Sequence, residues 1–263
     1  MTRSANDAPH ILITNDDGIH ADGLRALSEA VRDLGTVSIV APIQERSAAA
    51  QSLTLRQPIF CERVGEHEWA VDGTPTDAMI VALHRLFPKH PDLVISGINR
   101  GGNLGENVYY SGTVGAAMEA AINRVPAFAI SLAHRGTGFV YEHSAAFARR
   151  LAEVVLAQGL PPDLLLNVNV PFNWRGKVRF TRQSTKVTRN VLQEGTDPRG
   201  RTYYWLTEEQ VTSGLDPASD YAAIFDGDIS ITPLELDRTH EPSLNHLSDW
   251  VRLLQISDQP VKR

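Results

Sequence analysis

The 263-residue chain has a single cysteine, Cys61, and no run of apolar residues near the ~18 that a membrane-spanning helix requires. One cysteine cannot form an internal disulfide bond or a thiolate metal cluster. This excludes the small disulfide-rich scaffolds and makes a reducing compartment the simpler expectation. The first ten residues also lack the apolar segment of an export signal. We therefore expect a cytoplasmic protein without a membrane partner.

The chain also lacks an excess of positive charge. It has 25 Lys and Arg residues against 31 Asp and Glu residues, which gives a formal net charge of −6. Proteins whose main role is to bind the backbone of a nucleic acid need a surplus of basic residues, so we expect no binding to a nucleic-acid polymer. A small anionic ligand is compatible with this charge if a bound metal ion supplies positive charge locally.

Glycine and proline, at 19 and 15 residues, are not enriched, which excludes a collagen-like or low-complexity chain. Hydrophobic residues make up 42% of the chain and charged residues 21%, as in an ordinary globular protein. At this length we expect one large domain, or a core domain with an arm.

Five short apolar runs in the first two-thirds of the chain have the composition of buried strands. They are residues 10–14, 37–41, 93–96, 127–132 and 164–170. Patterns typical of helices lie between them. This alternation predicts an α/β fold with a mostly parallel sheet that is covered by helices on both faces.

Four helices are expected between these strands. Apolar residues at helical spacing after Asp22 predict a first helix, for which Gly35 is the expected C-terminal glycine. The segment Thr74-Pro75-Thr76-Asp77 combines a hydroxyl, a proline and a carboxylate, which is typical of a helix start. The helices expected after it cover residues 78–87, 114–122 and 142–158, and the last of them ends at Gly159.

The composition changes after Pro171. Residues 178–182 and 202–206 have strand character and flank a polar segment, which predicts a protruding β-hairpin arm. A last strand is expected over 228–234. An apolar stripe predicts a final helix that docks on its own subunit or on a neighbour; it consists of Leu244, Leu247, Trp250, Val251 and Leu254. We therefore divide the chain into a core, residues 1–171, and a second part, residues 172–263, with the arm, the last core strand and the C-terminal helix.

Two adjacent carboxylates, Asp16 and Asp17, follow the first predicted strand, and Gly18 comes directly after them. In open α/β sheets, ligands bind beyond the carboxyl ends of the strands. Neighbouring carboxylates repel each other, and a hard divalent cation such as Mg²⁺, Mn²⁺ or Ca²⁺ removes that repulsion. A solvated Asp-Gly turn explains the same residues without a ligand. These residues alone leave both interpretations open.

Other predicted strand ends carry further polar groups. Ser47 follows the second strand, and Asn99 and Asn103 lie in a glycine-rich loop past a later one. Next, Ser111, Gly112 and Thr113 lead into a predicted helix, whose first N–H groups and positive dipole end suit a phosphate. A helix cap whose glycines serve packing only is the alternative explanation.

Together these strand ends predict one site, in which carboxylates, an amide and a hydroxyl hold a cation while a helix terminus receives an anionic group. That combination suits hydrolysis of a phosphate ester. The first strand is not followed by a Walker loop, a Gly-x-Gly-x-x-Gly fingerprint or a Gly-x-Ser-x-Gly elbow. Dinucleotide redox and serine-hydrolase chemistry are therefore disfavoured.

Five ordered sequence blocks also carry a family resemblance. They are Ile13-Thr-Asn-Asp-Asp-Gly-Ile19, Val40-Ala-Pro42 with Arg46-Ser47, Val71-Asp-Gly-Thr-Pro-Thr-Asp77, Ser96-Gly-Ile-Asn-Arg-Gly-Gly-Asn-Leu-Gly105 and Tyr110-Ser-Gly-Thr-Val-Gly-Ala-Ala117. On these blocks the chain resembles the SurE family, the stationary-phase survival proteins that act as 5′/3′-nucleotidases. It departs from the family at Gly227-Asp228, where many members have Gly-Tyr, and this bears on packing near the last strand.

The resemblance implies a site and a reaction. The implied ligands of one divalent metal ion per subunit, Mg²⁺ or Mn²⁺ with Ca²⁺ as a further occupant, are Asp16, Asp17, Ser47 and Asn99, and the two aspartates are also the implied catalytic residues. The implied phosphate contacts are Asn103, Ser111, Gly112 and Thr113. The implied reaction is metal-dependent hydrolysis of nucleoside 5′- and 3′-monophosphates, with short polyphosphate as a further substrate.

The resemblance also implies a Rossmann-like fold with a protruding arm and a C-terminal helix exchanged between the subunits of a homodimer or homotetramer. Two mechanisms stay open: attack by water, or attack by an aspartate to give an aspartyl-phosphate. A sensor that binds a phospholigand without turnover is the alternative function. His20 and Arg46 lie near the acidic turn. A surface histidine is the favoured interpretation of His20 over a role in proton transfer, and an ordinary ion pair is favoured for Arg46 over steering of an anionic substrate.

Overall fold

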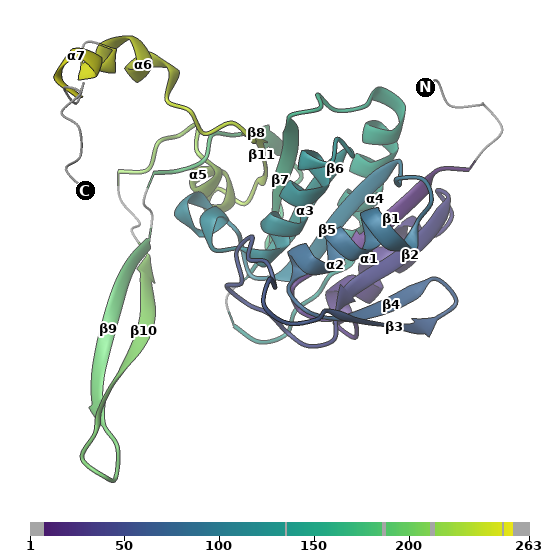
Figure 1. Ribbon diagram of the computed structural model, residues 1–263, viewed down its shortest axis with the longest axis horizontal. Coiled ribbons are helices and arrows are strands. Elements are labelled where there is room, and N and C mark those ends of the chain that lie inside the picture. The colour runs from purple at the N-terminus through teal and green to yellow at the C-terminus, as the bar shows by residue number, and fades with distance from the viewer. Residues whose placement is uncertain (1–7, 135, 186–187, 211–213, 249, 255–263) are drawn as a thin grey trace, which may run out of the picture.

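The computed structural model describes residues 8–134, 136–185, 188–210, 214–248 and 250–254. Within these residues, nine strands form one sheet in the order β3-β4-β2-β1-β5-β6-β7-β11-β8, and β9 and β10 form a separate hairpin (Figure 1). The α/β architecture with a mostly parallel sheet is thus confirmed.

The strands and helices have the following bounds. The sheet contains β1 (His10–Thr14), β2 (Thr36–Pro42), β3 (Phe60–Gly65), β4 (Glu68–Asp72), β5 (Leu93–Arg100), β6 (Ala127–Ala133), β7 (Leu164–Pro171), β8 (Val178–Phe180) and β11 (Ile229–Glu235), and the hairpin contains β9 (Thr188–Thr196) and β10 (Thr202–Gln210). The helices are α1 (Asp22–Val31), α2 (Pro75–Val81), α3 (Gly112–Ile122), α4 (Glu142–Gln158), α5 (Asp220–Phe225), α6 (Glu241–Leu247) and α7 (Trp250–Leu254). A π-helical turn, η1 (Ala82–Leu86), continues α2, and a 3₁₀ turn, η2 (Gly105–Tyr109), precedes α3.

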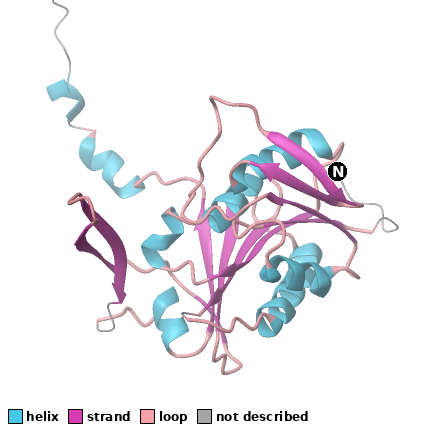
Figure 2. Ribbon diagram, turned by 90° about the horizontal axis from the view of Figure 1, so that it is seen from below, coloured by secondary structure: helices cyan, strands magenta, loops and turns pink. Residues whose placement is uncertain are grey.

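The centre of the sheet is parallel and buried on both faces. The strands β2, β1, β5, β6 and β7 run parallel, whereas β11 is antiparallel to β7 and β3 is antiparallel to β4. The pairs α1 with α4 and α2 with α3 pack against each other and belong to two separate apolar clusters. Figure 2 shows helices on both sides of the sheet. Two covered faces explain why these strands read as continuous apolar runs.

The sheet has a topological switch point at β1. This strand pairs with β2 on one side and with β5 on the other, so the chain leaves β1 and β5 in opposite directions. Such a switch point opens a crevice beyond the carboxyl ends of the two strands. The acidic turn after β1 and the glycine-rich segment at the end of β5 both lie at this edge.

Local sequence signals explain several helix ends. In α2, the Thr74 hydroxyl accepts a hydrogen bond from the Asp77 backbone N–H at 3.0 Å, and the Asp77 carboxylate accepts one from the Thr74 N–H at 2.8 Å. This is the predicted capping box. The helix α4 covers the predicted residues and ends at Gly159, whose φ of +75° favours glycine.

The prediction for the end of the first helix is wrong. We expected Gly35 to be its C-terminal glycine, but α1 already has its C-cap at Arg32. A Cβ atom on Gly35 would lie 2.0 Å from the backbone oxygen of Pro9, so this glycine is required by close packing and not by a helix end.

The prediction of a β-hairpin arm is correct, but one of its two predicted strands is wrong. Residues 178–180 form β8 in the main sheet, beside β11, and not the first strand of the arm. That first strand is β9, which pairs antiparallel with β10. The polar composition of β9 hid it, because a hairpin exposed on both faces has no apolar alternation.

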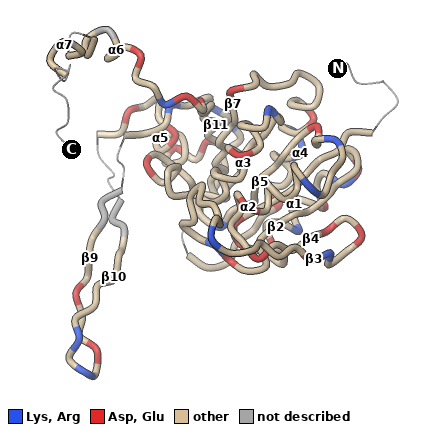
Figure 3. Tube along the Cα trace, viewed as in Figure 1, with Lys and Arg blue, Asp and Glu red and all other residues tan. Residues whose placement is uncertain are grey.

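The arm and the last two helices extend away from the sheet (Figure 1). Charged residues of both signs are scattered over the molecule and gather at the tip of the arm, where Arg201 Nε lies 2.7 Å from Asp197 Oδ2 (Figure 3). The predicted final helix forms two shorter helices, α6 and α7, and Leu244, Trp250 and Leu254 are exposed. Within the described residues, none of the helices combines the length and apolarity that a bilayer-spanning segment requires.

Candidate functional site

The acidic turn after β1 is held by its own side chains. Asn15 Nδ2 donates to the Gly18 carbonyl oxygen at 2.9 Å, and the Gly18 N–H donates to Asn15 Oδ1 at 3.2 Å. Gly18 has a φ of +100°, which an L side chain rarely adopts. Asn15 is fully buried, so the turn fixes where Asp16 and Asp17 leave the sheet.

Asp16 is a buried carboxylate against the first turn of α3. Asp16 is only 5% exposed, and its Oδ1 accepts a hydrogen bond from the Thr113 hydroxyl. Gly112 packs so closely that a Cβ atom there would lie 2.9 Å from the Cβ of Asp16. Burial raises the pKa of Asp16 to about 6, with a smaller contribution from the charge of Asp17, while the Thr113 hydrogen bond opposes the shift.

Asp17 lies beside the end of β5. Its Oδ2 accepts a hydrogen bond from the Arg100 backbone N–H at 3.0 Å. Burial raises the pKa of this carboxyl, and the Arg100 hydrogen bond and charge partly offset that effect. The Arg100 side chain instead contacts Glu45, at 3.4 Å, and the ring of Phe139, at 5.9 Å. Among the described residues, no basic side chain forms an ion pair with Asp16 or Asp17.

Two neutral oxygen groups lie near these carboxylates. Asn99 Nδ2 donates to the Gly101 carbonyl oxygen at 2.8 Å, which orients the amide and leaves Oδ1 as its ligand atom. The Ser47 hydroxyl is exposed and donates to Glu45 Oε1 at 2.6 Å. The Arg46 N–H donates to the Asp16 carbonyl oxygen at 2.7 Å, which ties the Ser47 loop to the acidic turn.

Asn103 is fixed by a buried network from two other strands. Its Nδ2 donates to Ser131 Oγ at 2.8 Å, and its carbonyl oxygen accepts from Asn167 Nδ2 at 2.8 Å and Asn169 Nδ2 at 3.1 Å. Asn169 Oδ1 also accepts from the Asn103 N–H at 2.8 Å. The roles of Asn167 and Asn169 were not predicted from the sequence. The available signal was that these two asparagines alternate with apolar residues in the buried strand β7, where a polar side chain needs a hydrogen-bond partner.

The N-terminus of α3 faces the same region. Ser111 is the N-cap, and its Oγ accepts a hydrogen bond from the Val114 N–H at 3.1 Å, so its own O–H is left to donate. The first N–H groups of a helix have no partner within the helix, and they carry the positive end of its dipole. Gly112 and Thr113 pack on Asp16, whose carboxylate also interacts with the backbone N–H of Thr113.

A cavity of about 420 Å³ joins these groups. Five predicted site residues line it: Asp16, Ser47, Asn99, Asn103 and Ser111. The other three are not among its lining residues: Gly112 and Thr113 contact Asp16, and Asp17 contacts the backbone of Arg100. Sequence analysis did not place Leu206, which lines the cavity from β10, or Arg100, which lines it from β5.

The donor set fits a hard divalent cation. Among the described residues no three His, Cys, Asp or Glu side chains gather as a metal cluster, so a cation here would need the neutral oxygens of Asn99 and Ser47 beside the two carboxylates. All four groups are oxygen donors, as Mg²⁺ and Mn²⁺ prefer. The buried Asp16 carboxylate, with its raised pKa, has the unbalanced negative charge that such an ion would neutralise.

Fold and site together define an α/β protein with an oxygen-rich cavity between an acidic strand end and a helix N-terminus. A family model described as survival protein SurE matches residues 11–191, and the chain belongs to that family. The resemblance drawn from the sequence blocks is thus confirmed.

Relatives and a solved structure cover almost the whole chain. A protein of Geobacter metallireducens named 5′-nucleotidase SurE is 46% identical over 243 residues, which are 91% of this chain and 96% of the relative. A protein of Geobacter sulfurreducens with the same name is 46% identical over 244 residues, 92% of this chain and 93% of its own length. The crystal structure of the SurE protein from Aquifex aeolicus superposes with a TM-score of 0.83 at 35% identity, covering 92% of this chain and all of that one.

Proposed function

We propose that the chain is a metal-dependent phosphomonoesterase that hydrolyses nucleoside 5′- and 3′-monophosphates to nucleoside and phosphate. The observation that carries this proposal is the buried carboxylate of Asp16, which lies against the N-terminus of α3 without a basic partner among the described residues. The names of the relatives support the nucleotidase reaction. Short polyphosphate is a further proposed substrate, because it presents the same terminal phosphate.

The residues that would hold one divalent ion per subunit are Asp16, Asp17, Ser47 and Asn99. The ion would be Mg²⁺ or Mn²⁺, and Ca²⁺ has the same preference for oxygen ligands. When bound, it supplies Lewis acidity to the phosphate and to a nearby water. The protein supplies the arrangement: Thr113 orients Asp16, and the Arg100 N–H orients Asp17.

The phosphate would lie at the N-terminus of α3. The N–H groups of Gly112 and Thr113 and the Ser111 hydroxyl would donate to its oxygens, and Asn103 would border it from the opposite loop. Fixed donors stabilise the charge that builds up on the phosphate oxygens as the ester bond breaks, because they need no reorganisation during the reaction. The nucleophile is either water or Asp16 itself.

Phosphate release tests the proposal. We expect the purified protein to release phosphate from AMP and 3′-AMP when Mn²⁺ or Mg²⁺ is added and to stop when EDTA is added. The Asp16→Asn variant should lose this activity by about 100- to 1,000-fold, the range for loss of a group that stabilises transition-state charge. Absence of phosphate release from nucleotides, tripolyphosphate and an aryl phosphate with every ion would refute an enzyme and leave the alternative, a phospholigand sensor on the same fold.

Rapid quench separates the two nucleophiles. Attack by Asp16 gives a phosphorylated Asp16 peptide within the first turnover, whereas attack by water gives none. The stereochemistry at phosphorus, followed with a chiral phosphate ester, is the second measurement: one direct displacement by water inverts the configuration, whereas two displacements through an aspartyl-phosphate retain it.

We also propose that the chain forms a homodimer or homotetramer through its second part, residues 172–263, while residues 1–171 carry the proposed metal and phosphate ligands. The exposed apolar side chains of α6 and α7, Leu244, Leu247, Trp250 and Leu254, support an exchange of these helices between subunits. Light scattering tests this directly. Trp250→Glu should shift the mass towards the monomer, and an unchanged mass would exclude α7 from the interface.

A further inference from the structure

A second, smaller pocket lies beside the proposed catalytic cavity. It encloses about 120 Å³, and Gly102 and Asn107 line both spaces. The remaining wall comes from the loop after β5, the end of β6 and the helix α5, through Leu104, Ala133, His134, Tyr221, Ile224 and Phe225. The two spaces therefore adjoin at Gly102 and Asn107.

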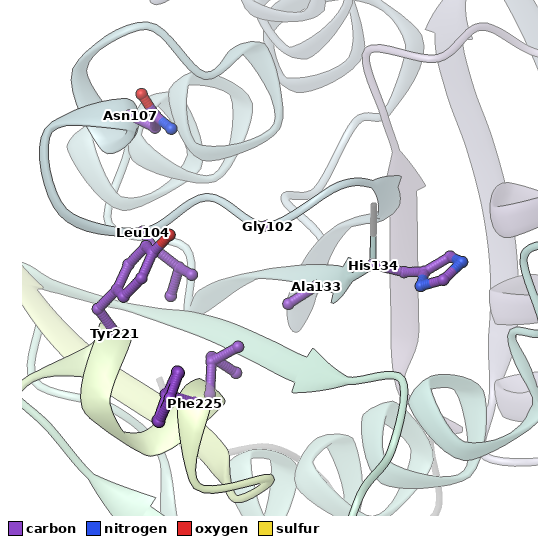
Figure 4. Close-up of a pocket in the computed structure, with 8 residues that line it drawn as sticks. Gly102, Leu104, Asn107, Ala133, His134, Tyr221 and Phe225 are labelled. Atoms are coloured by element: carbon purple, nitrogen blue, oxygen red, sulfur yellow. The ribbon is translucent and has the colours of Figure 1, made fainter. Parts of the chain in front are cut away.

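The lining of this pocket is apolar and aromatic, in contrast to the oxygen-rich cavity next to it. Leu104 and Tyr221 are both 7% exposed and pack together, so they provide a rigid base. Phe225 is 66% exposed and lies at the mouth. Figure 4 shows Tyr221 and Phe225, from α5, on one side and the Ala133 side chain, from the end of β6, on the other, while the ring of His134 is directed away from them.

The side of the pocket opposite α5 is held in place by stacked rings. The imidazole of His134 stacks on Phe172 with ring centroids 4.2 Å apart, and Phe139 meets it edge-on at 5.3 Å. His134 Nε2 also lies 3.3 Å from the Thr137 carbonyl oxygen, so this nitrogen is the one that carries the proton. These ring contacts hold the end of β6, so that Ala133 is fixed opposite Tyr221 and Phe225, the aromatic side chains that a planar ligand would meet.

We propose that this pocket binds the nucleobase of a nucleoside monophosphate whose phosphate lies at the N-terminus of α3. This inference rests on the proposed function and names the part of the substrate that lies outside the reaction centre. The pocket is too small for a whole nucleotide, since ligand sites of that kind enclose roughly 300 Å³ or more. A flat heteroaromatic ring is the part of the substrate that matches its size and its aromatic wall.

The pocket predicts that the enzyme prefers substrates that carry a nucleobase, with little preference for one base over another. An exposed ring such as Phe225 recognises a base by stacking, and every nucleobase offers a π face. We therefore expect Phe225→Ala to lower kcat/KM for AMP and CMP alike by about 5- to 100-fold, mostly through KM, because stacking on one aromatic side chain is worth that range. Hydrolysis of ribose 5-phosphate, which has no base, should stay within about twofold of the wild type.

The experiment compares these substrates in four proteins with Mn²⁺ present: wild type, Phe225→Ala, Phe225→Tyr and Phe180→Ala. Phe225→Tyr keeps the ring and should restore AMP hydrolysis. Phe180, on β8, is 75% exposed and lines neither space, so Phe180→Ala is the matched control and should behave like the wild type.

Three results would overturn the pocket's role: an unchanged KM for AMP in Phe225→Ala, an equal loss with ribose 5-phosphate, or the same base-specific loss in Phe180→Ala. If the wild type hydrolyses neither substrate, the proposed function fails separately. Saturation-transfer NMR then tests the pocket without turnover, because a base stacked on Phe225 gives a signal on the adenine protons of AMP that Phe225→Ala removes.

Discussion

The hydroxyl of Thr113, in the first turn of α3, donates a hydrogen bond to Oδ1 of Asp16, which follows β1. The two residues are 97 positions apart in the chain and are fully buried or nearly so. One contact thus joins the proposed cation ligand to the helix terminus proposed to receive the phosphate. Any movement of the helix would move the carboxylate with it.

Replacing Thr113 by valine tests this relationship, because valine keeps the shape and removes the hydroxyl. We expect affinity for Mn²⁺, measured by calorimetry, to fall about 10- to 100-fold, the usual cost of losing a group that orients a metal ligand. The hydrogen bond also lowers the pKa of Asp16, so its loss should raise that pKa further. Thr113→Ser keeps the donor and should retain most of the affinity; a valine variant that binds Mn²⁺ normally would contradict the proposed role.

Neutralising Asp16 should stabilise the cation-free protein. Its folded pKa of about 6 lies above the ordinary value of 3.8, so the ionised form destabilises the fold at pH 8 by about 3 kcal/mol. We expect Asp16→Asn to raise Tm in EDTA by several degrees while it abolishes activity. The exposed Asp22, at the start of α1, provides the control: Asp22→Asn should lower Tm slightly, because it removes a charge that favours the helix dipole. A lower Tm in Asp16→Asn would refute the prediction.

Binding of the cation should depend on pH in the range set by Asp16. Because the folded pKa is raised, the protonated form is the stable one below about 6, and stability without the cation declines as pH rises from 3.8 through about 6. The cation must displace this proton, so its affinity should rise as pH increases from 5 to 7 and level off above that. Calorimetry in two buffers of different ionisation enthalpy measures the protons released. Constant affinity over this range would refute the predicted link between protonation of Asp16 and cation binding.

The close packing of Gly112 on Asp16 gives a steric prediction. A Cβ atom at Gly112 would lie 2.9 Å from the Asp16 Cβ and 3.1 Å from both its Oδ2 and the Pro75 side chain. We expect Gly112→Ala to reduce phosphatase activity at least tenfold, because it displaces the carboxylate and narrows access to the helix terminus. Gly65→Ala is the control, since its Cβ would meet only the flexible Glu68 side chain. Equal activity of the two variants would mean that the tight contact is not needed.

The sequence predicted the parts of the fold that depend on local signals. Runs of buried strand residues and the capping box at Thr74 and Asp77 were sufficient for the α/β core, because their cause lies within a few neighbouring residues. Gly35 and β8 were misplaced because their roles depend on Pro9 and β11, which are distant in the chain. Tertiary packing there overrides the local pattern.

The candidate site likewise has parts that follow from local sequence signals and parts that depend on contacts between distant residues. Asp16, Asn99 and Ser111 were named from the sequence because strand ends and helix starts are readable there. The support of Asn103 by Asn167 and Asn169 and the approach of Leu206 were not, since each joins segments at least 60 residues apart. Only the folded chain brings such partners together.

The hairpin of β9 and β10 forms its own sheet, yet Leu206 on it borders the cavity that holds Asp16. Among the described residues the hairpin shares no strand pairing with the core, so its side chains can be changed without loosening the sheet that positions Asp16. Exchanging the hairpin of β9 and β10 between homologues would therefore be a route to enzymes that accept different leaving groups while the catalytic residues stay the same.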